Sequence, residues 1–388
     1  MKAKTWRLLK PLRKGILGGH PWIYDRALAP PSGLAAGDVV TITDEAGPIA
    51  TAIADPDSPL RARVLELDVA RPIDAAWIRG RAGAAARRRA ADPLLAGCTG
   101  VRVIHGEGDG CPGLVIDRYD TTAVVVFDGA AASAFWRPRL PDVIAALDDV
   151  QPLAHVWLRG ERGQRGAGEA WRGDPPELVA IAEDAARFHV DVRHGQKTGF
   201  FLDQRDNRRL IARHADAARV LNVFSYTGGF SIHAALGGAE HVTSVDIAAS
   251  AIAALEANLA LSGVPSHRHE SAAMDAFDFF ARAAKKRRTW DLVIVDPPSF
   301  APSERTKPAA LAAYGKLAAA ALEVVGPGGR FALASCSSHV TEADLLGVAA
   351  ELPAALRLRC AAGAGSDHPV LPAFPEGRYL KFLFFDVG

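Results

Sequence analysis

The chain has 388 residues, of which 49% are hydrophobic and 23% charged, and its formal net charge is +1. This composition excludes a wholly disordered chain, and the near-neutral charge excludes a protein that coats nucleic acid indiscriminately. At this length we expect two or three domains. No stretch approaches the ~20 apolar residues that span a bilayer, and the first residues lead into no signal-type apolar run, so we expect a cytoplasmic protein without a membrane partner.

The four cysteines, Cys98, Cys111, Cys336 and Cys360, show no C-x-x-C spacing. This spacing indicates neither a zinc site nor a disulfide framework, so we expect no bound metal. Free thiols are typical of a reducing compartment, which agrees with a cytoplasmic location.

Residues 1–72 have the pattern of a small β domain. Apolar and polar residues alternate over 37–44, a turn follows at 45–48, and further strands are predicted over 49–54 and 61–67. The segment 18–24 begins with glycine and contains proline, so we interpret it as an ordered surface loop.

Residues 73–185 indicate a separate α+β domain. The segment 75–92 has a helical pattern with arginines on one side, and a turn-rich loop follows at 104–113. Residues 159–176 hold five glycines and four arginines without apolar periodicity, which predicts a mobile basic loop. The other predicted elements are strands over 114–119, 123–127 and 155–158 and a helix over 138–149.

Residues 186–388 alternate between strand and helix patterns, which is typical of a parallel sheet covered by helices on both faces. Two late strands, over 356–360 and 379–387, are joined by a loop and predict an antiparallel edge. The earlier predicted strands are 220–224, 241–245, 291–295 and 330–334, and the predicted helices are 230–236, 248–261, 275–284 and 308–325.

A cofactor loop is predicted directly after the strand over 220–224. Gly228 and Gly229 allow a sharp turn that brings backbone N–H groups close to a ligand, and a helix follows. Asp246 closes the next strand 18 residues after Gly228, where an acid can bind both ribose hydroxyls of a nucleoside. Tyr226 stands where the dinucleotide pattern G-x-G-x-x-G has its first glycine, which favours S-adenosylmethionine over NAD. The alternative is an ordinary βαβ turn.

Two chemically competent groups follow central strands. Asp296 ends the strand over 291–295 and is followed by two prolines that stiffen the loop and expose the Pro297 carbonyl; the alternative is an acid that caps the next helix. Cys336 follows the apolar strand over 330–334, where it is either a buried small side chain or a nucleophile. Together they suit methyl transfer to C5 of cytosine or uracil, because a thiolate that adds to C6 makes C5 nucleophilic and Asp296 can stabilise or protonate N3.

Basic residues form three clusters, at 79–89, 159–172 and 285–288. Such a run is usually a solvated face. Three of them beside a nucleoside-cofactor fold favour an RNA or DNA substrate.

Ordered blocks along the chain resemble the bacterial 23S ribosomal RNA cytosine-C5 methyltransferases of the RlmI type. They include Gly-His-Pro-Trp near the start and Asp-Pro-Pro-Ser-Phe in the catalytic half, and the full set is 19–22, 106–109, 112–113, 194–207, 222–230, 296–300, 335–337, 367–369 and 374–381. The chain departs from the pattern at Ser299, where related enzymes often carry lysine, and over 159–176.

The resemblance implies a PUA-like domain at 1–72 that grips RNA, a central α+β domain of the EEHEE type at 73–185, and a Rossmann-like class I methyltransferase domain at 186–388. It implies 5-methylcytosine formation in 23S rRNA, with Cys336 as the nucleophile, and leaves a homodimer open. The positions that would hold S-adenosylmethionine are Ser225, Tyr226, Thr227 and Gly228 in the loop, Asp246 at the ribose, Asp275, Ala276 and Phe277 at the adenine, and Phe201, Gln204, Arg208 and Asp296 near the methionine end.

Two other functions remain open at this point. An Asp-Pro-Pro loop also serves methylation of a purine at N7 or at an exocyclic amine, which needs no cysteine. A non-catalytic RNA-binding assembly factor could retain the same fold and need not bind S-adenosylmethionine.

Overall fold

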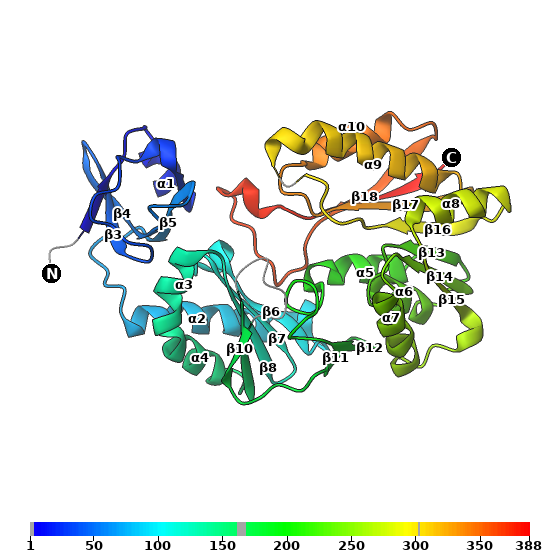
Figure 1. The fold of residues 1–388 in the computed structure, drawn as a ribbon, viewed down its shortest axis with the longest axis horizontal. Helices are drawn as coiled ribbons and strands as arrows, with labels where there is room; N and C mark the ends of the chain where they lie inside the picture. The colour runs from blue at the N-terminus through cyan, green and yellow to red at the C-terminus, as the bar shows by residue number, and fades with distance from the viewer. Residues whose placement is uncertain (1–3, 161–167, 302) are drawn as a thin grey trace. The chain divides into compact units, whose positions relative to one another are not determined.

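The computed structural model describes residues 4–160, 168–301 and 303–388 (Figure 1). Its internal contacts divide the chain into two compact units. The first unit extends to Ile181 and also includes Val190–Leu202 and Ser366–Gly377, and the second holds Ala182–His189, Asp203–Gly365 and Arg378–Gly388. No helix among these described residues is both long and apolar enough to cross a membrane.

The N-terminal part of the first unit is a five-stranded sheet, as the alternating pattern predicts. Its core includes Trp6, Ile23 and Ile42. The segment 18–24 was predicted as a surface loop, and this is wrong in part: Ile23 is fully buried, and its strand pairs with the one that holds Ala62. The sheet order is β1 (Lys4–Arg7), β3 (Val39–Asp44), β4 (Gly47–Ala54), β5 (Leu60–Glu66) and β2 (Trp22–Tyr24), with α1 at Arg13–Leu17.

A second five-stranded sheet forms the α+β part of this unit. Its order is β10 (Gly168–Arg172), β9 (His155–Arg159), β8 (Thr122–Phe127), β7 (Leu114–Tyr119) and β6 (Gly100–His105), and its helices are α2 (Ala75–Ala90), α3 (Ala130–Trp136) and α4 (Leu140–Asp148). The prediction of a loop over 159–176 is wrong for β10, which pairs antiparallel with β9 and is fixed by an Arg172–Asp148 ion pair of 2.8 Å. Residues 161–167 of that predicted loop lie outside the described part of the chain.

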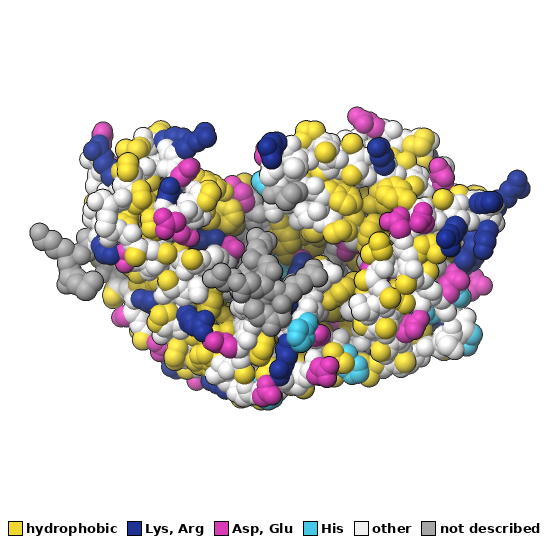
Figure 2. All heavy atoms as spheres, in the orientation of Figure 1, with side chains coloured by type: hydrophobic (Ala, Val, Ile, Leu, Met, Phe, Trp, Pro, Cys, Tyr) yellow, Lys and Arg dark blue, Asp and Glu magenta, His cyan; other side chains and the backbone are white. Residues whose placement is uncertain are grey.

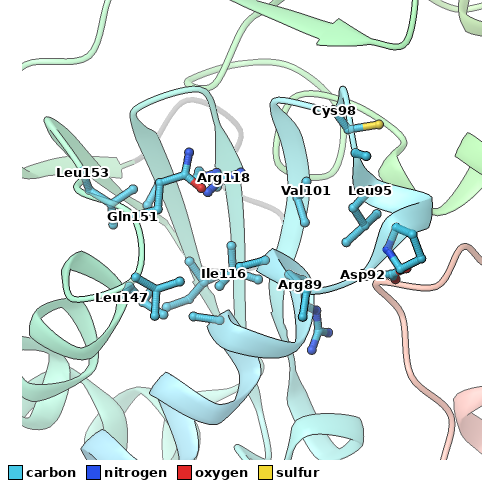
Figure 3. Close-up of a pocket in the computed structure, with 18 residues that line it drawn as sticks. Arg89, Asp92, Leu95, Cys98, Val101, Ile116, Arg118, Leu147, Gln151 and Leu153 are labelled. Atoms are coloured by element: carbon cyan, nitrogen blue, oxygen red, sulfur yellow. The ribbon is translucent and has the colours of Figure 1, made fainter.

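Figure 3 shows a cavity of about 400 Å³ in this α+β domain, beside the end of α2. Aliphatic side chains such as Leu95, Ile116 and Leu147 line it, and Arg118 and Gln151 add polar groups. None of the side chains predicted to act in catalysis or to bind the cofactor lines this cavity.

The second unit is built on a seven-stranded sheet in which β19 runs antiparallel to both β17 and β18, as predicted for the late strands. The strand order is β15 (His269–Ala273), β14 (His241–Asp246), β13 (Arg219–Val223), β16 (Trp290–Val295), β17 (Val325–Ser335), β19 (Lys381–Val387) and β18 (Leu356–Ala362). A separate two-stranded sheet pairs β11 (Val179–Glu183) with β12 (Ala186–Val190).

Helices cover both faces of the seven-stranded sheet (Figure 1). On one face pack α5 (Arg205–Ala212), α6 (Gly229–Leu236) and α7 (Ala249–Leu261), and on the other α8 (Ala276–Lys285), α9 (Lys307–Leu322) and α10 (Glu342–Ala350). Separate buried clusters fill the two faces, one around Phe230 and Phe382 and one around Phe280 and Tyr314. The predicted α/β architecture is therefore confirmed, and the carboxyl ends of five parallel strands meet at one edge.

A buried charge network ties the two late segments of the first unit to its α+β domain. Asp109 accepts from both nitrogens of the Arg89 guanidinium, at 2.6 and 2.7 Å, and Arg89 also donates to the Asp367 carbonyl at 2.8 Å. On the other segment, Thr198 donates to Asp117 at 2.5 Å and bonds the Tyr119 hydroxyl at 2.7 Å. These contacts explain why residues distant in sequence belong to one compact unit.

Asp109→Asn should destabilise the first unit, because it leaves the buried Arg89 guanidinium without its counter-charge. Breaking such a buried pair costs about 3–5 kcal/mol. We expect the thermal midpoint of this unit to fall by roughly 5–15 °C, measured by circular dichroism or differential scanning. Glu45→Gln, which breaks the exposed Arg7–Glu45 pair, is the matched control and should leave that midpoint nearly unchanged.

Candidate active site

The loop after β13 adopts unusual backbone geometry. Phe224, Tyr226 and Gly228 all have positive φ, at 63°, 45° and 91°. Left-handed conformations in residues other than glycine cost about 1–3 kcal/mol and cluster at ligand clamps. The helix α6 then begins at Gly229, so its free N–H groups face the same edge of the sheet.

Two hydroxyls in this loop are left unsatisfied. The side-chain oxygens of Ser225 and Thr227 are buried and have no hydrogen-bond partner among the described residues. A buried hydroxyl without a partner costs about 1–3 kcal/mol, so the loop suits a ligand that supplies polar groups. The predicted cofactor, S-adenosylmethionine, carries an amino acid group and a ribose and therefore fits this requirement.

Asp246 lies at the end of β14 and closes the loop. Its two carboxylate oxygens accept from the backbone N–H groups of Tyr226 and Ala248, each at 2.9 Å. Each oxygen keeps a further lone pair, so the half-exposed carboxylate can also accept from ribose hydroxyls.

Two exposed apolar side chains follow the neighbouring strands β14 and β15: Ile247 comes directly after Asp246, and Phe277 is the second residue of α8, the helix after β15. Ile247 is 71% exposed and Phe277 is 49% exposed, and Asp246 pairs with Ala273 at the end of β15. Such side chains can cover the faces of an adenine ring. Sequence reasoning missed Ile247, whose only signal is its position directly after the acid.

The other residues predicted at the adenine have different surroundings. Asp275 caps α8 and accepts from the backbone N–H groups of Phe277 and Asp278, at 2.8 and 3.3 Å, whereas Ala276 is buried.

Arg208 lies beneath the loop. It is 2% exposed, and its guanidinium binds Glu183 at 2.6 and 2.5 Å, with His233 2.8 Å from the same carboxylate. Burial would raise the pKa of Glu183, but Arg208 and His233 outweigh it and hold that pKa well below its usual range. A Cβ at Gly229 would lie 2.9 Å from Arg208 Cδ, so the arginine packs directly under the start of α6. Phe201 belongs to the first unit, where the Lys197 ammonium lies 4.6 Å from its ring centroid.

Asp296 is held by a chain of two amides. The Asn207 amide donates to Gln204 Oε1 at 2.6 Å, and Gln204 Nε2 donates to Asp296 Oδ2 at 2.9 Å. Because Asn207 fixes which end of Gln204 faces the acid, Asp296 Oδ2 is presented as an acceptor. Gln204 therefore contacts a predicted catalytic group.

Cys336 is partly exposed and lies directly after β17, between two buried serines. The Tyr314 hydroxyl donates to Ser335 Oγ at 2.9 Å, and Ser337 Oγ bonds Ser299 Oγ at 2.9 Å. Ser299, which departs from the family pattern, thus joins the Asp-Pro-Pro loop to the cysteine loop.

The parallel pairing of β16 and β17 brings the predicted catalytic pair to one edge of the sheet, near Tyr314. Burial raises the pKa of its hydroxyl, and the charges of Cys336 and Asp296 raise it further, while hydrogen bonds from the neighbouring serines act in the opposite direction. Both groups therefore act on the same hydroxyl, as expected for residues at the ends of the adjacent parallel strands β16 and β17.

Lys381 is a buried cation that sequence reasoning gave no role. It is 4% exposed and donates to the carbonyls of Ser337 and Tyr379, at 2.6 and 2.8 Å. Its sequence signals are its place at the end of the block 374–381 and its position directly before the apolar run 382–385.

The fold and this site define a methyltransferase. A family model described as S-adenosylmethionine-dependent methyltransferase matches residues 147–358, and a PUA-like domain model matches residues 7–67. The chain belongs to the S-adenosylmethionine-dependent methyltransferase family, and within it to the group that includes the following two relatives.

The first is the "Ribosomal RNA large subunit methyltransferase" of Deinococcus radiodurans, which is 38% identical over 98% of this chain and 97% of the relative. The second is the "Ribosomal RNA large subunit methyltransferase I" of Cronobacter sakazakii, which is 33% identical over 96% of this chain and 97% of the relative. Among solved structures, the methyltransferase SMU.776 in complex with SAH aligns over 100% of both chains, with a TM-score of 0.86 and 23% identity, and supports the fold.

Asp246→Ala should weaken S-adenosylmethionine binding. Charge-assisted hydrogen bonds are worth about 1.5–3 kcal/mol, so we expect a roughly 10- to 150-fold rise in Kd, measured by calorimetry. Asp291→Ala is a matched control, because Asp291 also accepts a backbone N–H, from Arg219 at 2.8 Å, but at the opposite edge of the sheet. Equal affinities for the two variants would contradict the assignment of Asp246.

Proposed function

We propose that this enzyme forms 5-methylcytosine in 23S ribosomal RNA, with Cys336 as the nucleophile. The observation that carries the proposal is a partly exposed cysteine beside Asp296 at the carboxyl ends of two adjacent strands. The names of the relatives support large-subunit ribosomal RNA as the substrate. Since that RNA is made and assembled in the bacterial cytoplasm, we place the enzyme there.

The mechanism follows from the two side chains. The Cys336 thiolate adds to C6 of the cytosine, and the electron pair of the C5–C6 bond moves to make C5 nucleophilic. Asp296, oriented by Gln204, donates a proton to N3 of the ring from its protonated form and so neutralises the negative charge that develops there. Bound S-adenosylmethionine supplies the electrophilic methyl group. A base then takes the C5 proton, the electrons of that C–H bond restore the C5–C6 double bond, and the S–C6 bond breaks with its electron pair returning to the Cys336 sulfur.

Five side chains hold the cofactor in this proposal. The hydroxyls of Ser225 and Thr227 gain the polar partners that they lack, Asp246 binds the ribose, and Ile247 and Phe277 cover the adenine. The remaining predicted positions act less directly. Tyr226 and Gly228 shape the loop through their positive φ angles, and Arg208 supports the loop from below. Asp275 and Ala276 start α8, and Gln204 orients Asp296. Phe201 keeps its proposed place near the methionine end.

The basic clusters differ in what they offer to RNA. In the first, Arg79, Arg81, Arg88 and Arg89 are paired with carboxylates. The residues Lys285, Lys286 and Arg287 are exposed, and Figure 2 shows basic side chains grouped beside α8. However, α8 starts near the carboxyl edge of the sheet and ends near its amino edge, away from Cys336. The segment 159–172 remains the proposed RNA contact, although Arg172 is paired with Asp148; Arg162 and Arg165 lie outside the described residues.

Replacing Arg159, Arg162 and Arg165 by alanine should weaken RNA binding and reduce its salt dependence. Each lost phosphate contact to single-stranded RNA lowers the slope of log K against log salt by about 0.7, so three contacts lower it by about 2. Binding is measured by filter retention or fluorescence anisotropy between 50 and 300 mM salt. The control removes the same charge at Lys285, Lys286 and Arg287 and should leave the slope unchanged. If only the control variant lowers the slope, the RNA binds at the surface of Lys285, Lys286 and Arg287 instead.

Cys336→Ala should abolish methyl transfer while binding of S-adenosylmethionine and RNA persists, because only activation of C5 needs the covalent bond. RNA with 5-fluorocytosine at the target should trap a covalent complex with the unchanged enzyme but not with this variant, since fluorine blocks the final elimination. Cys360→Ala, at a half-buried cysteine in β18, is the control and should trap normally. An active Cys336→Ala variant that forms no adduct would instead support purine methylation by the Asp296–Pro297 loop.

A further inference from the structure

Lys381 lies at the point where the cysteine loop leaves the sheet. The strand β19 pairs antiparallel with β17, and the register places Lys381 opposite Ser335, the residue before Cys336. The ammonium then donates to the carbonyl of Ser337, the residue after Cys336, at 2.6 Å. One cation is therefore linked to the chain on both sides of the proposed nucleophile.

The hydrogen bonds of this ammonium are incomplete. An ammonium has three N–H donors, and the carbonyls of Ser337 and Tyr379 take two of them. Burying a lysine is unfavourable unless its charge is compensated. Burial lowers the pKa of Lys381 to about 8, whereas the charges of Cys336 and Asp344 act in the opposite direction and raise it. The interaction with Cys336 is mutual, so a protonated Lys381 also favours the thiolate.

Among the described residues around this loop, further ionisable groups include acids, a phenol and cations that lie close to acids. Asp296 after β16 and Asp344 on α10 are acids, and Tyr314 on α9 is a phenol whose pKa is raised. The Lys307 ammonium is paired with Asp344 at 2.8 Å, and His339 lies 3.3 Å from Glu304. Neighbouring negative charges disfavour a thiolate, so a nearby positive charge such as that of Lys381 is needed to stabilise the thiolate of Cys336.

We propose that the Lys381 ammonium holds Cys336 in its thiolate form and so acts as a positioning residue for methyl transfer. This inference rests on the proposed role of Cys336. When Lys381 is neutral, the proton passes from Sγ to Nζ, and an ion pair results. The sulfur electron pair then forms the S–C6 bond, and when that bond breaks after loss of the C5 proton, the pair returns to sulfur beside the same ammonium. Lys381 itself forms no bond to carbon.

The proton transfer is energetically accessible. An ordinary cysteine has a pKa near ~8.5, and that of Lys381 is about 8. The two groups therefore compete for one proton, and the charge of Cys336 already contributes to the pKa of Lys381. The attraction between the two charges favours the ion pair over the neutral pair of thiol and amine.

The test measures the thiol directly, without RNA or S-adenosylmethionine. The full chain with Cys360→Ala is alkylated with iodoacetamide between pH 5.5 and 10, and mass spectrometry of the Cys336 peptide gives the rate at each pH. With Lys381 present, we expect the midpoint at least about one unit below the ordinary thiol value. Lys381→Met should raise the midpoint by about one unit or more, with roughly tenfold slower alkylation at pH 7 and similar rates at pH 10.

Lys381→Arg keeps the charge and should keep the midpoint low, whereas a purely steric role predicts that methionine and arginine behave alike. Equal midpoints for the unchanged chain and Lys381→Met would overturn the proposal. If the methionine variant fails to fold, a midpoint at or above ~8.5 in the unchanged chain overturns it equally. An active Cys336→Ala variant would refute the proposed function but would leave this thiol measurement unaffected, so the two failures are distinguishable.

Discussion

The parallel pairing of β14, β13, β16 and β17 is the constraint on which the candidate site depends. Parallel neighbours end at the same edge of a sheet, so Asp246, the 224–228 loop, Asp296 and Cys336 are brought together although they span more than a hundred positions in sequence. The antiparallel strand β19 adds to this edge from the other direction. Its first residue, rather than its last, lies beside the end of β17, and that residue is Lys381.

Ser337 and Tyr314, whose roles sequence patterns could not reveal, hold the two catalytic loops together. Ser337 lies in the cysteine loop and binds both Ser299 of the Asp-Pro-Pro loop and the Lys381 ammonium through different atoms. Tyr314 reaches the same loop from α9. The two catalytic loops are thus cross-linked by hydroxyl groups, which explains how serine can occupy position 299 in this chain.

The alternation of elements from Arg219 to Ser335 could be predicted because its strands are buried apolar runs and its helices have a clear repeat. Asp246, Asp296 and Cys336 could be predicted for a related reason, since each follows such a run. The strand β15 could not, because His269–Ala273 is half-buried, largely polar and held by backbone pairing with β14. The short β2 and β10 were missed for a similar reason: glycine, proline and arginine conceal strands that tertiary contacts stabilise. Lys381, Tyr314 and Ser337 depend on contacts between residues 21 to 44 positions apart, which no local pattern encodes.

The buried charge network around Asp109 also affects when the first unit can complete its folding during synthesis. Its partner Asp367 lies only about twenty residues before the end of the chain, and Thr198 lies near the middle. During synthesis Arg89 can pair with Asp109 early, but its bond to the Asp367 carbonyl must wait until almost the whole polypeptide has left the ribosome. The chain passes between the two units five times, so a single cut at the end of the α+β domain would leave the first unit without Val190–Leu202 and Ser366–Gly377.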